Sequence, residues 1–207
     1  LELAAFPYVN GGLFADESIE IPTFTEEIRN LLLKNASEDF NWSEIRPTIF
    51  GAVFESTLNP ETRRKGGMHY TSIENIHKVI DPLFMDSLNS EFKEICGNKT
   101  LSKSQKEKLF AFQKKLGSLT FLDPACGSGN FLTETFLSLR RLENKIISLL
   151  NKGERVFGFD EFIHVKISQF FGIEINDFAV TVAKTALWIA ESQMINETEK
   201  IMGQQIS

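Results

Sequence analysis

Cysteine is scarce in the sequence, and long apolar runs are absent. Cys96 and Cys126 are its only cysteines among 207 residues, and neither has the CxxC or Cys/His spacing of a metal site. This usage argues against a disulfide framework and against structural zinc. The apolar runs are short and broken by polar residues, so none approaches the roughly 20 residues that span a bilayer. A signal-peptide pattern is also lacking. We therefore expect a cytoplasmic, globular protein with no metal site and no membrane contact.

Positive charge is in deficit. The sequence has 22 Lys and Arg against 28 Asp and Glu, which gives a formal net charge of -6. Binding of nucleic-acid phosphates requires a clustered Lys/Arg surface, so this chain is a poor nucleic-acid binder by itself. Any such partner would be held mostly by another part of the protein. The chain opens with LELAAF and stops at GQQIS, and we interpret it as a piece of a longer protein.

Two common nucleotide-binding loops are incomplete or missing. A phosphate loop requires Gly-Lys-Ser/Thr, and this triplet does not occur in the chain. A dinucleotide fingerprint within FLDPACGSGNFL, residues 121–132, would require a third glycine at position 132, where Leu132 stands. ATP, nicotinamide and flavin cofactors are therefore disfavoured.

Residues 1–118 carry helix signals. Three hydroxyl residues are followed three positions later by Glu or Gln, a spacing that predicts capped helix starts: Thr23 with Glu26, Thr71 with Glu74, and Ser102 with Gln105. Pro82 should kink or split the second helix, because proline removes a backbone donor. Gly117 is well placed to end the third helix.

The hydrophobic period changes after Gly117. SLTFL is short and apolar and is bounded by turn residues, as expected of a buried parallel strand. A helix over about 130–150 follows, then a segment at 151–169 to which the pattern assigns no role. FFGIEI predicts a second strand, followed by a helix capped by Asn176 or Asp177. Strand, helix, strand, helix is the beginning of a doubly wound sheet.

The turn after the first predicted strand is a ligand-binding candidate. Gly127 and Gly129 let backbone approach a ligand closely, and the free amides at the start of the next helix favour an anionic group. Asp123 is placed to meet a positive group. Glu174 ends the second predicted strand, where a carboxylate can accept hydrogen bonds from both hydroxyls of a ribose. An amino-acid moiety at the glycines together with a ribose at Glu174 describes S-adenosylmethionine.

These motifs resemble those of a known family. DPACGSGNFL resembles motif I of the bacterial DNA amino-methyltransferases, GIEIND resembles their motif II, and HYTS at residues 69–72 resembles motif X, in the gamma order. PYVNGGLF, IFGAVFES, RRKGGMHYTS and KVIDPLFMDSL look like the helical spacer and methyltransferase start of the MmeI-like restriction-modification proteins. The resemblance covers most of the chain.

The resemblance implies roles for individual residues. Tyr70 and Thr71 would close over the methionine end of S-adenosylmethionine, and Asp123 would face its amino group. The turn would be lined by Ala125, Cys126, Gly127, Ser128, Gly129 and Asn130. Glu174 would bind the ribose hydroxyls, with Ile175 and Asn176 beside the adenine. We interpret Cys126 as a small residue in a tight turn, because no partner pattern marks it as a nucleophile.

The resemblance also implies an activity, adenine N6 methylation of double-stranded DNA in a bacterial restriction-modification system. The family's Asn/Asp-Pro-Pro-Tyr/Phe loop, which positions the flipped base, does not occur in these 207 residues. We therefore assign no catalytic residue and expect the chain to be inactive alone, lacking its catalytic and target-recognition parts. The alternative is a non-catalytic helical scaffold with a vestigial cofactor fold.

The predicted fold class is α/β, a mainly helical N-terminal region followed by the first part of a Rossmann-like methyltransferase sheet. We expect a helical spacer at 1–66 and the N-terminal part of the methyltransferase domain at 67–207. The latter divides into a motif X helical part, 67–118, and an α/β cofactor-binding part, 119–207. A sheet of so few strands leaves an open edge, so self-association of the chain through that edge is expected.

Overall fold

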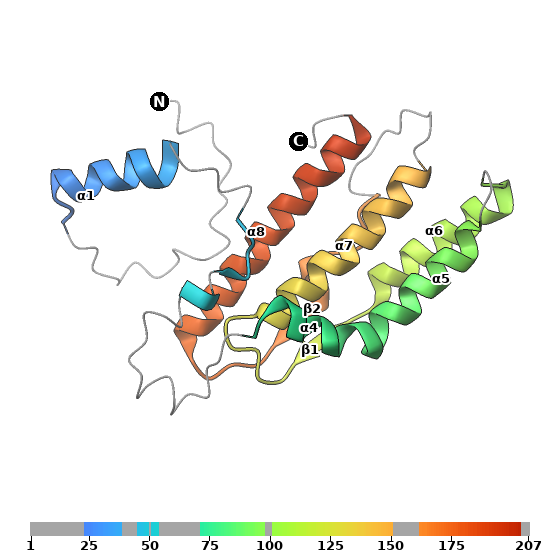
Figure 1. The fold of residues 1–207 in the computed structure, drawn as a ribbon, viewed down its shortest axis with the longest axis horizontal. Coiled ribbons are helices and arrows are strands. Elements are labelled where there is room, and N and C mark those ends of the chain that lie inside the picture. The colour runs from blue at the N-terminus through green and yellow to red at the C-terminus, as the bar shows by residue number, and fades with distance from the viewer. Residues whose placement is uncertain are drawn as a thin grey trace. The chain divides into compact units, whose positions relative to one another are not determined.

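A computed structural model of the chain describes residues 23–38, 45–49, 51–53, 71–97, 101–150 and 162–203 (Figure 1). The chain divides into two compact units, residues 1–45 and residues 46–207. The domain boundary expected between residues 66 and 67 lies outside the described residues and stays a prediction.

The first unit contains one described helical stretch. It begins as α1 (Glu26–Asn30) and continues as a π-helical segment, Leu31–Glu38. Thr25 is its N-cap, and the Thr25 hydroxyl accepts a hydrogen bond from the Ile28 amide at 3.3 Å. The cap expected at Thr23 is therefore wrong by two residues, because Thr25 is the hydroxyl residue that directly precedes the first helical residue, Glu26.

Within its described residues, the second unit consists mainly of helices with two short strands (Figure 1). The elements are α4 (Ile73–Ile80), α5 (Asp86–Cys96), α6 (Lys103–Ser118), β1 (Phe121–Asp123), α7 (Asn130–Leu150), β2 (Phe170–Gly172) and α8 (Asp177–Met202). A π-helical segment, Asp81–Met85, joins α4 to α5, and a 3-10 turn, Ile167–Gln169, precedes β2. The helix predicted over 130–150 is confirmed as α7.

The start of α4 and its junction with α5 follow from local chemistry. Ser72 is the N-cap of α4 and accepts a hydrogen bond from the Asn75 amide at 3.4 Å, so the cap expected at Thr71 is wrong by one residue. Pro82 lies at the start of the π-helical segment. The predicted interruption is confirmed: proline removes one α-helical bond, and the wider turn lets the helix continue as α5.

The predicted capping box of α6 is present. Ser102 accepts from the Gln105 amide, and the Gln105 side chain accepts from the Ser102 amide at 2.9 Å. Gly117 does not end the helix as expected, since α6 runs to Ser118. A Cβ at position 117 would lie 2.7 Å from the Cβ of His164, so this glycine serves the close approach of the segment before β2.

The two strands form a parallel pair whose faces differ. Phe121 pairs with Phe170 and Leu122 with Phe171. The Phe121 and Phe170 rings stack with centroids 5.2 Å apart, and Phe136 of α7 meets Phe170 edge-on at 5.5 Å. Leu122 and Phe171 are 63% and 53% exposed on the other face. The expectation of a buried parallel strand therefore holds for the Phe121 face alone.

Helices α7 and α8 pack closely because α8 presents small residues at helical spacing. The buried residues along α8 are Ala179, Ala183, Ala186, Ala190, Met194 and Thr198. Their separations of three and four positions place them on one face. Short side chains let the two helix axes approach, and this packing fixes the start of α7, where the turn after β1 ends.

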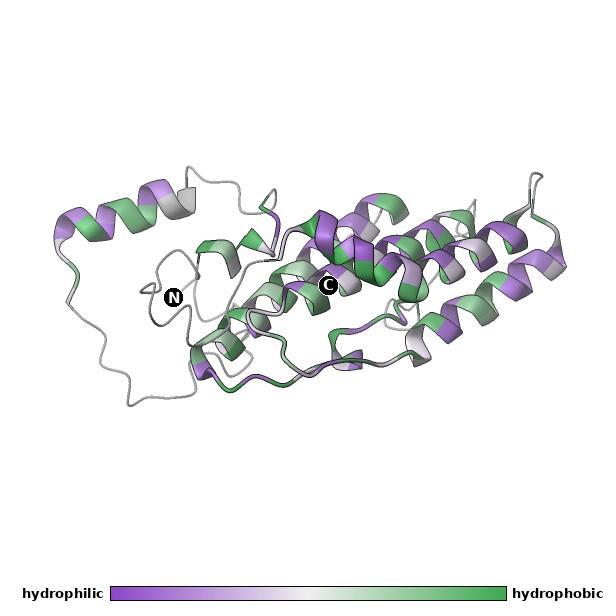
Figure 2. Cartoon of the chain, turned by 60° about the horizontal axis from the view of Figure 1, so that its bottom comes forward, coloured by the Kyte–Doolittle hydropathy of each residue, from purple (hydrophilic) through white to green (hydrophobic). Residues whose placement is uncertain are grey.

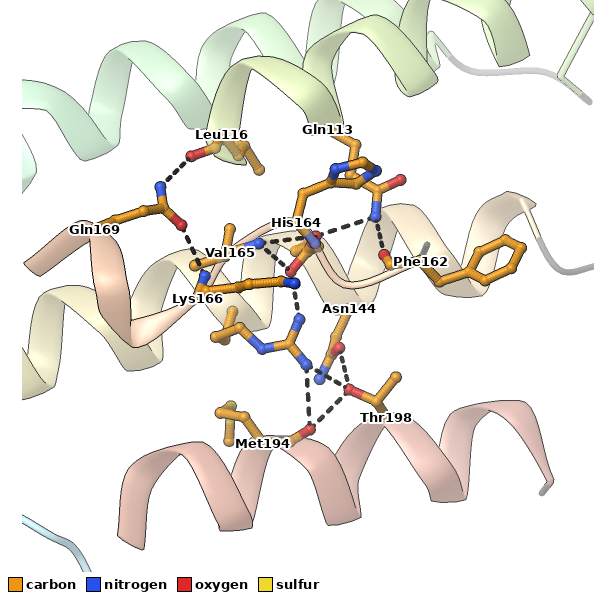
Figure 3. Close-up of polar contacts among 12 residues, drawn as sticks. Gln113, Leu116, Asn144, Phe162, His164, Val165, Lys166, Gln169, Met194 and Thr198 are labelled. Atoms are coloured by element: carbon orange, nitrogen blue, oxygen red, sulfur yellow. Dashed lines mark hydrogen bonds and ion pairs between the residues drawn. The ribbon is translucent and has the colours of Figure 1, made fainter. Parts of the chain in front are cut away.

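A buried polar network lies farther along these helices (Figure 3). The Arg140 guanidinium pairs with the Glu143 carboxylate, and its other nitrogen donates to the Thr198 hydroxyl at 2.7 Å. Glu143 accepts from the His164 amide at 2.6 Å and from the Gln113 side chain at 3.1 Å. The segment at 151–169, which the sequence left without a role, is thus tied at its described end to α6 and α7.

The helices that the structure describes carry a mixture of apolar and polar residues. Hydrophobic and hydrophilic residues alternate along them (Figure 2), and none of those described is long and apolar enough to cross a membrane. Among the described residues, no group of three His, Cys, Asp or Glu side chains is arranged to hold a metal ion.

Candidate functional site

The turn between β1 and α7 is held against the chain that leaves β2. The Ile173 amide donates to the Asp123 carbonyl at 2.9 Å, and the Cys126 amide donates to the Ile173 carbonyl at 3.0 Å. The strand pairing therefore continues one residue beyond Gly172. Both strands end at one edge, which is where parallel sheets place their ligands.

Backbone conformation within the turn depends on two glycines. Gly127 and Gly129 have positive φ angles of 53° and 76°, which L-residues with a side chain rarely adopt. The Gly129 amide donates to the Cys126 carbonyl at 2.8 Å. The Asp123 carboxylate accepts from the Ala125 amide at 3.0 Å, which stabilises the start of the turn.

Close packing beneath the turn also depends on glycine. A Cβ at position 129 would lie 2.7 Å from the Cβ of Ala183 in α8. Leu132, which stands where a dinucleotide fingerprint has its third glycine, is buried, and its Cδ1 would lie 3.1 Å from a Cβ at Gly172. The small residue that permits helix-to-strand packing is thus on the strand here, and not on the helix.

Glu174 joins the two predicted halves of the site. One carboxylate oxygen accepts from the Gly127 amide at 2.9 Å. The other accepts from the amides of Ile175 and Asn176, at 2.8 Å and 2.9 Å. Three backbone donors therefore orient one half-buried carboxylate. A carboxylate has about four acceptor positions, so one acceptor position on the oxygen nearer Gly127 is not used by these bonds.

Apolar residues near Glu174 in the sequence are exposed to solvent. Ile175 is 95% exposed, Ile173 is 55% exposed and Phe178 is 61% exposed. Asn176 caps α8, and its side-chain oxygen accepts from the Ala179 amide at 3.0 Å. A carboxylate held by amides beside exposed apolar groups can bind a molecule that has both hydroxyls and a flat apolar ring.

The electrostatic field of the site is negative. Burial raises the pKa of the Cys126 thiol above its ordinary value, and the charges of Asp123 and Glu174 raise this pKa further. The thiol therefore stays protonated at neutral pH, as a structural cysteine does and a nucleophilic one does not. The same two carboxylates favour a ligand with positive charge.

The structure brings together most of the predicted site residues that it describes. Asp123, Ala125, Cys126, Gly127, Glu174, Ile175 and Asn176 are joined by the hydrogen bonds above. Ser128, Gly129 and Asn130 are buried at the start of α7. Thr71 is half-buried before α4 and takes no part in those bonds, and Tyr70 lies outside the described residues. Binding of a cofactor by this set stays a prediction.

Sequence reasoning missed one residue at the turn. Gly51 lies in a helical turn, residues 51–53, and a Cβ there would lie 2.4 Å from the Ser128 hydroxyl and 2.7 Å from the Asn130 side-chain oxygen. An isolated glycine inside an apolar helical pattern was the signal that could have indicated a close contact.

Comparison with known proteins identifies the family to which the chain is similar. A family model described as "MmeI, DNA-methyltransferase domain" matches residues 99–206. DNA methyltransferase A of Bacillus subtilis (strain 168) is 45% identical over 197 residues, which cover 94% of this chain and 21% of that protein. A putative type II restriction enzyme and methyltransferase of Methanocaldococcus jannaschii is 28% identical over 219 residues, covering 89% of this chain and 18% of that protein.

A solved structure is also similar. The type IIL restriction-modification enzyme MmeI, determined in complex with DNA, superposes with a TM-score of 0.84 at 43% identity, covering 99% of this chain and 26% of that one. The chain thus spans between 18% and 26% of the length of the relatives it matches.

Proposed function

Because the chain belongs to the family of MmeI DNA-methyltransferase domains, we propose that it is the S-adenosylmethionine-binding part of a DNA methyltransferase of a restriction-modification system. The observation that carries the proposal is the hydrogen bond between the Gly127 amide and the Glu174 carboxylate. These residues are the predicted contacts of the two ends of S-adenosylmethionine, and the bond places them at one edge of the sheet.

The residues present fit this cofactor. S-adenosylmethionine carries a positive sulfonium and a positive amino group, and Asp123 and Glu174 supply negative charge on the two sides of the turn. The unused acceptor position of Glu174 suits a ribose hydroxyl, and exposed Ile175 offers an apolar surface for the adenine. When bound, the cofactor supplies an electrophilic methyl group, and the residues of this chain hold and orient it.

Methyl transfer itself requires groups that this chain does not have. An exocyclic amine must be aligned with the methyl group, and acceptors must take up its developing charge. No Asn/Asp-Pro-Pro-Tyr/Phe loop occurs in the 207 residues. We therefore propose that the chain binds the cofactor but does not methylate DNA alone, and that the whole protein acts on adenine N6 of double-stranded DNA. Incubation with labelled S-adenosylmethionine and mixed-sequence DNA should give no turnover above background.

Calorimetric titration of the chain tests cofactor binding. S-adenosylmethionine and its demethylated product should bind, and NAD should not. Glu174→Ala should weaken binding at least about tenfold, as loss of a charged hydrogen-bond acceptor does. Glu91→Ala, which removes a partly exposed carboxylate on α5 that pairs with Lys115, should leave affinity unchanged. Binding of NAD alone would favour a nicotinamide enzyme, and no binding of any of the three would favour the scaffold alternative.

The remaining expectations belong to the same proposal. The two parallel strands would be the first of a doubly wound sheet in the whole protein, which would be cytoplasmic. In the isolated chain, exposed Leu122, Phe171 and Ile173 lie on or beside the uncovered sheet. We propose that this surface lets the chain self-associate. Sedimentation should then show a mass that rises with concentration, and a clean monomer at high concentration would contradict it.

A further inference from the structure

The turn that carries the proposed cofactor site rests on a helical segment that precedes it by many residues. Residues 51–53 are helical, and Pro47, Thr48 and Gly51 of the same segment are buried. The segment belongs to the same compact unit as β1, α7 and α8. It is coloured cyan in Figure 1. Burial at three positions shows that this short segment is packed and does not lie open on the surface.

Gly51 is the point where this segment meets the turn. A Cβ at position 51 would lie 2.4 Å from the Ser128 Oγ, 2.7 Å from the Asn130 Oδ1 and 3.0 Å from the Asn130 Nδ2. Glycine carries only a hydrogen in that direction. The φ angle of Gly51 is not in the left-handed region, in contrast to those of Gly127 and Gly129. This glycine is therefore required by space and not by backbone conformation.

The two side chains that face Gly51 cannot easily move aside. Asn130 is 7% exposed and Ser128 is 9% exposed. Both the oxygen and the nitrogen of the Asn130 side-chain amide lie close to position 51, so a 180° flip of this amide does not clear the space. The Asn130 Oδ1 is buried and has no hydrogen-bond partner among the described residues. Close packing against Gly51 therefore holds the Ser128 and Asn130 side chains in place at the start of α7.

We propose that Gly51 is a positioning residue for the cofactor site. Its missing side chain lets the 51–53 segment seat against Ser128 and Asn130, and this contact holds the turn in the conformation that presents its amides to the cofactor. The inference rests on the proposed function, since it assigns a role toward the same bound molecule. A larger residue at position 51 would push the turn away from this conformation, and binding would have to reverse that shift.

Gly51→Ala tests the proposal. Affinity for S-adenosylmethionine, measured by calorimetry, should fall about fivefold or more, which matches the lower end of an overpacking penalty that falls on the bound form. Ile49→Ala is the matched control, because Ile49 is 45% exposed in the same segment, and its affinity should stay within about twofold of that of the unchanged chain.

A double-mutant cycle separates positioning from general damage. Ser128→Ala removes the atom closest to a Cβ at position 51, so the loss caused by Gly51→Ala should shrink in the Ser128→Ala background by at least about threefold, as for residues in contact. Strict additivity of the two effects would overturn the proposal. If Gly51→Ala alone does not fold, recovery of the folded chain in the double variant supports the proposal, and failure to recover contradicts it.

A measurement on the cofactor-free chain tests the role of Gly51 independently of the proposed function. Amide NMR spectra of the cofactor-free chain should show shifts at Ser128, Gly129 and Asn130 in Gly51→Ala but not in Ile49→Ala. Unshifted resonances in Gly51→Ala would overturn the positioning role, whatever the chain binds. Absence of S-adenosylmethionine binding by the unchanged chain would instead overturn the proposed function, and the NMR shifts would still decide the role of Gly51.

Discussion

Two carboxylates of the same unit are held in different ways. Glu143 is fully buried, accepts from backbone amides and a glutamine, and is paired with the Arg140 guanidinium. Glu174 is half-buried and accepts from three backbone amides, and among the described residues it forms no ion pair. The fold neutralises the charge of Glu143 with Arg140, whereas it orients the charge of Glu174 with amides and places no cation of the described residues beside it. The first arrangement stabilises the chain, and the second suits a ligand.

The largest expected effect is the loss of stability that follows substitution of Glu143. Glu143→Ala leaves the Arg140 guanidinium buried without its partner, so the free energy of unfolding should fall by about 3 to 5 kcal/mol. Glu91→Ala is the matched control, because it breaks the exposed pair with Lys115, and it should cost less than about 1 kcal/mol. Urea denaturation measures both. Equal losses would mean that the buried network is not the stabilising feature.

The next effect contrasts two glycines of the turn. Gly129→Ala places a Cβ against Ala183 of α8 and strains a left-handed backbone. The free energy of unfolding should therefore fall by about 2 to 5 kcal/mol, the sum of the overpacking and backbone penalties. Gly127→Ala meets nothing within 4 Å and carries the backbone penalty alone, about 1 to 2 kcal/mol. Thermal denaturation of both variants checks the order. A larger loss for Gly127→Ala would contradict the packing described here.

Local chemistry made much of this predictable from the sequence. The long helix α7, the capping box at Ser102 and the interruption at Pro82 depend on residues close together in the chain, and all three were found. The wrong caps at Thr23 and Thr71 arose where neighbouring hydroxyl residues competed for the same role. Sequence pattern cannot choose between such neighbours, because the choice depends on backbone angles.

What could not be predicted depends on contacts between distant parts of the chain. The roles of Gly117 and Gly51 follow from the approach of His164 and of Ser128, and the pairing of Leu132 with Gly172 links a helix to a later strand. The bond between Gly127 and Glu174 joins residues 47 positions apart. Residue type suggested that both belong to a site, but only the fold brings them together.

The smallest expected effect concerns the pH dependence of stability. A hydrogen bond to Asp81 raises the pKa of His77 above its ordinary value near 6.5, and the Glu134 carboxylate raises it further, while burial opposes both. Since the folded pKa is the higher one, the stabilisation is fully present below about pH 6.5 and is lost as pH rises through the folded pKa.

The variant His77→Gln isolates this contribution. The difference in unfolding free energy between the unchanged chain and His77→Gln should be largest below pH 6.5 and should decline at higher pH. Lys78→Gln, on the exposed side of the same helix, is the control and should show no such decline near neutral pH. Urea denaturation over a pH series gives the comparison, and a difference that grows with pH would contradict the assigned direction.

The central claim is that the Glu174 carboxylate and the Gly127 to Gly129 turn bind one S-adenosylmethionine molecule together. Amide NMR during titration with S-adenosylmethionine tests it most directly, because each bond to Glu174 is made by a backbone amide. The account predicts that the amides of Gly127, Ile175 and Asn176 shift together with a single dissociation constant, and that Glu174→Ala abolishes their joint response. Shifts confined to one strand end, or a response that survives Glu174→Ala unchanged, would contradict it.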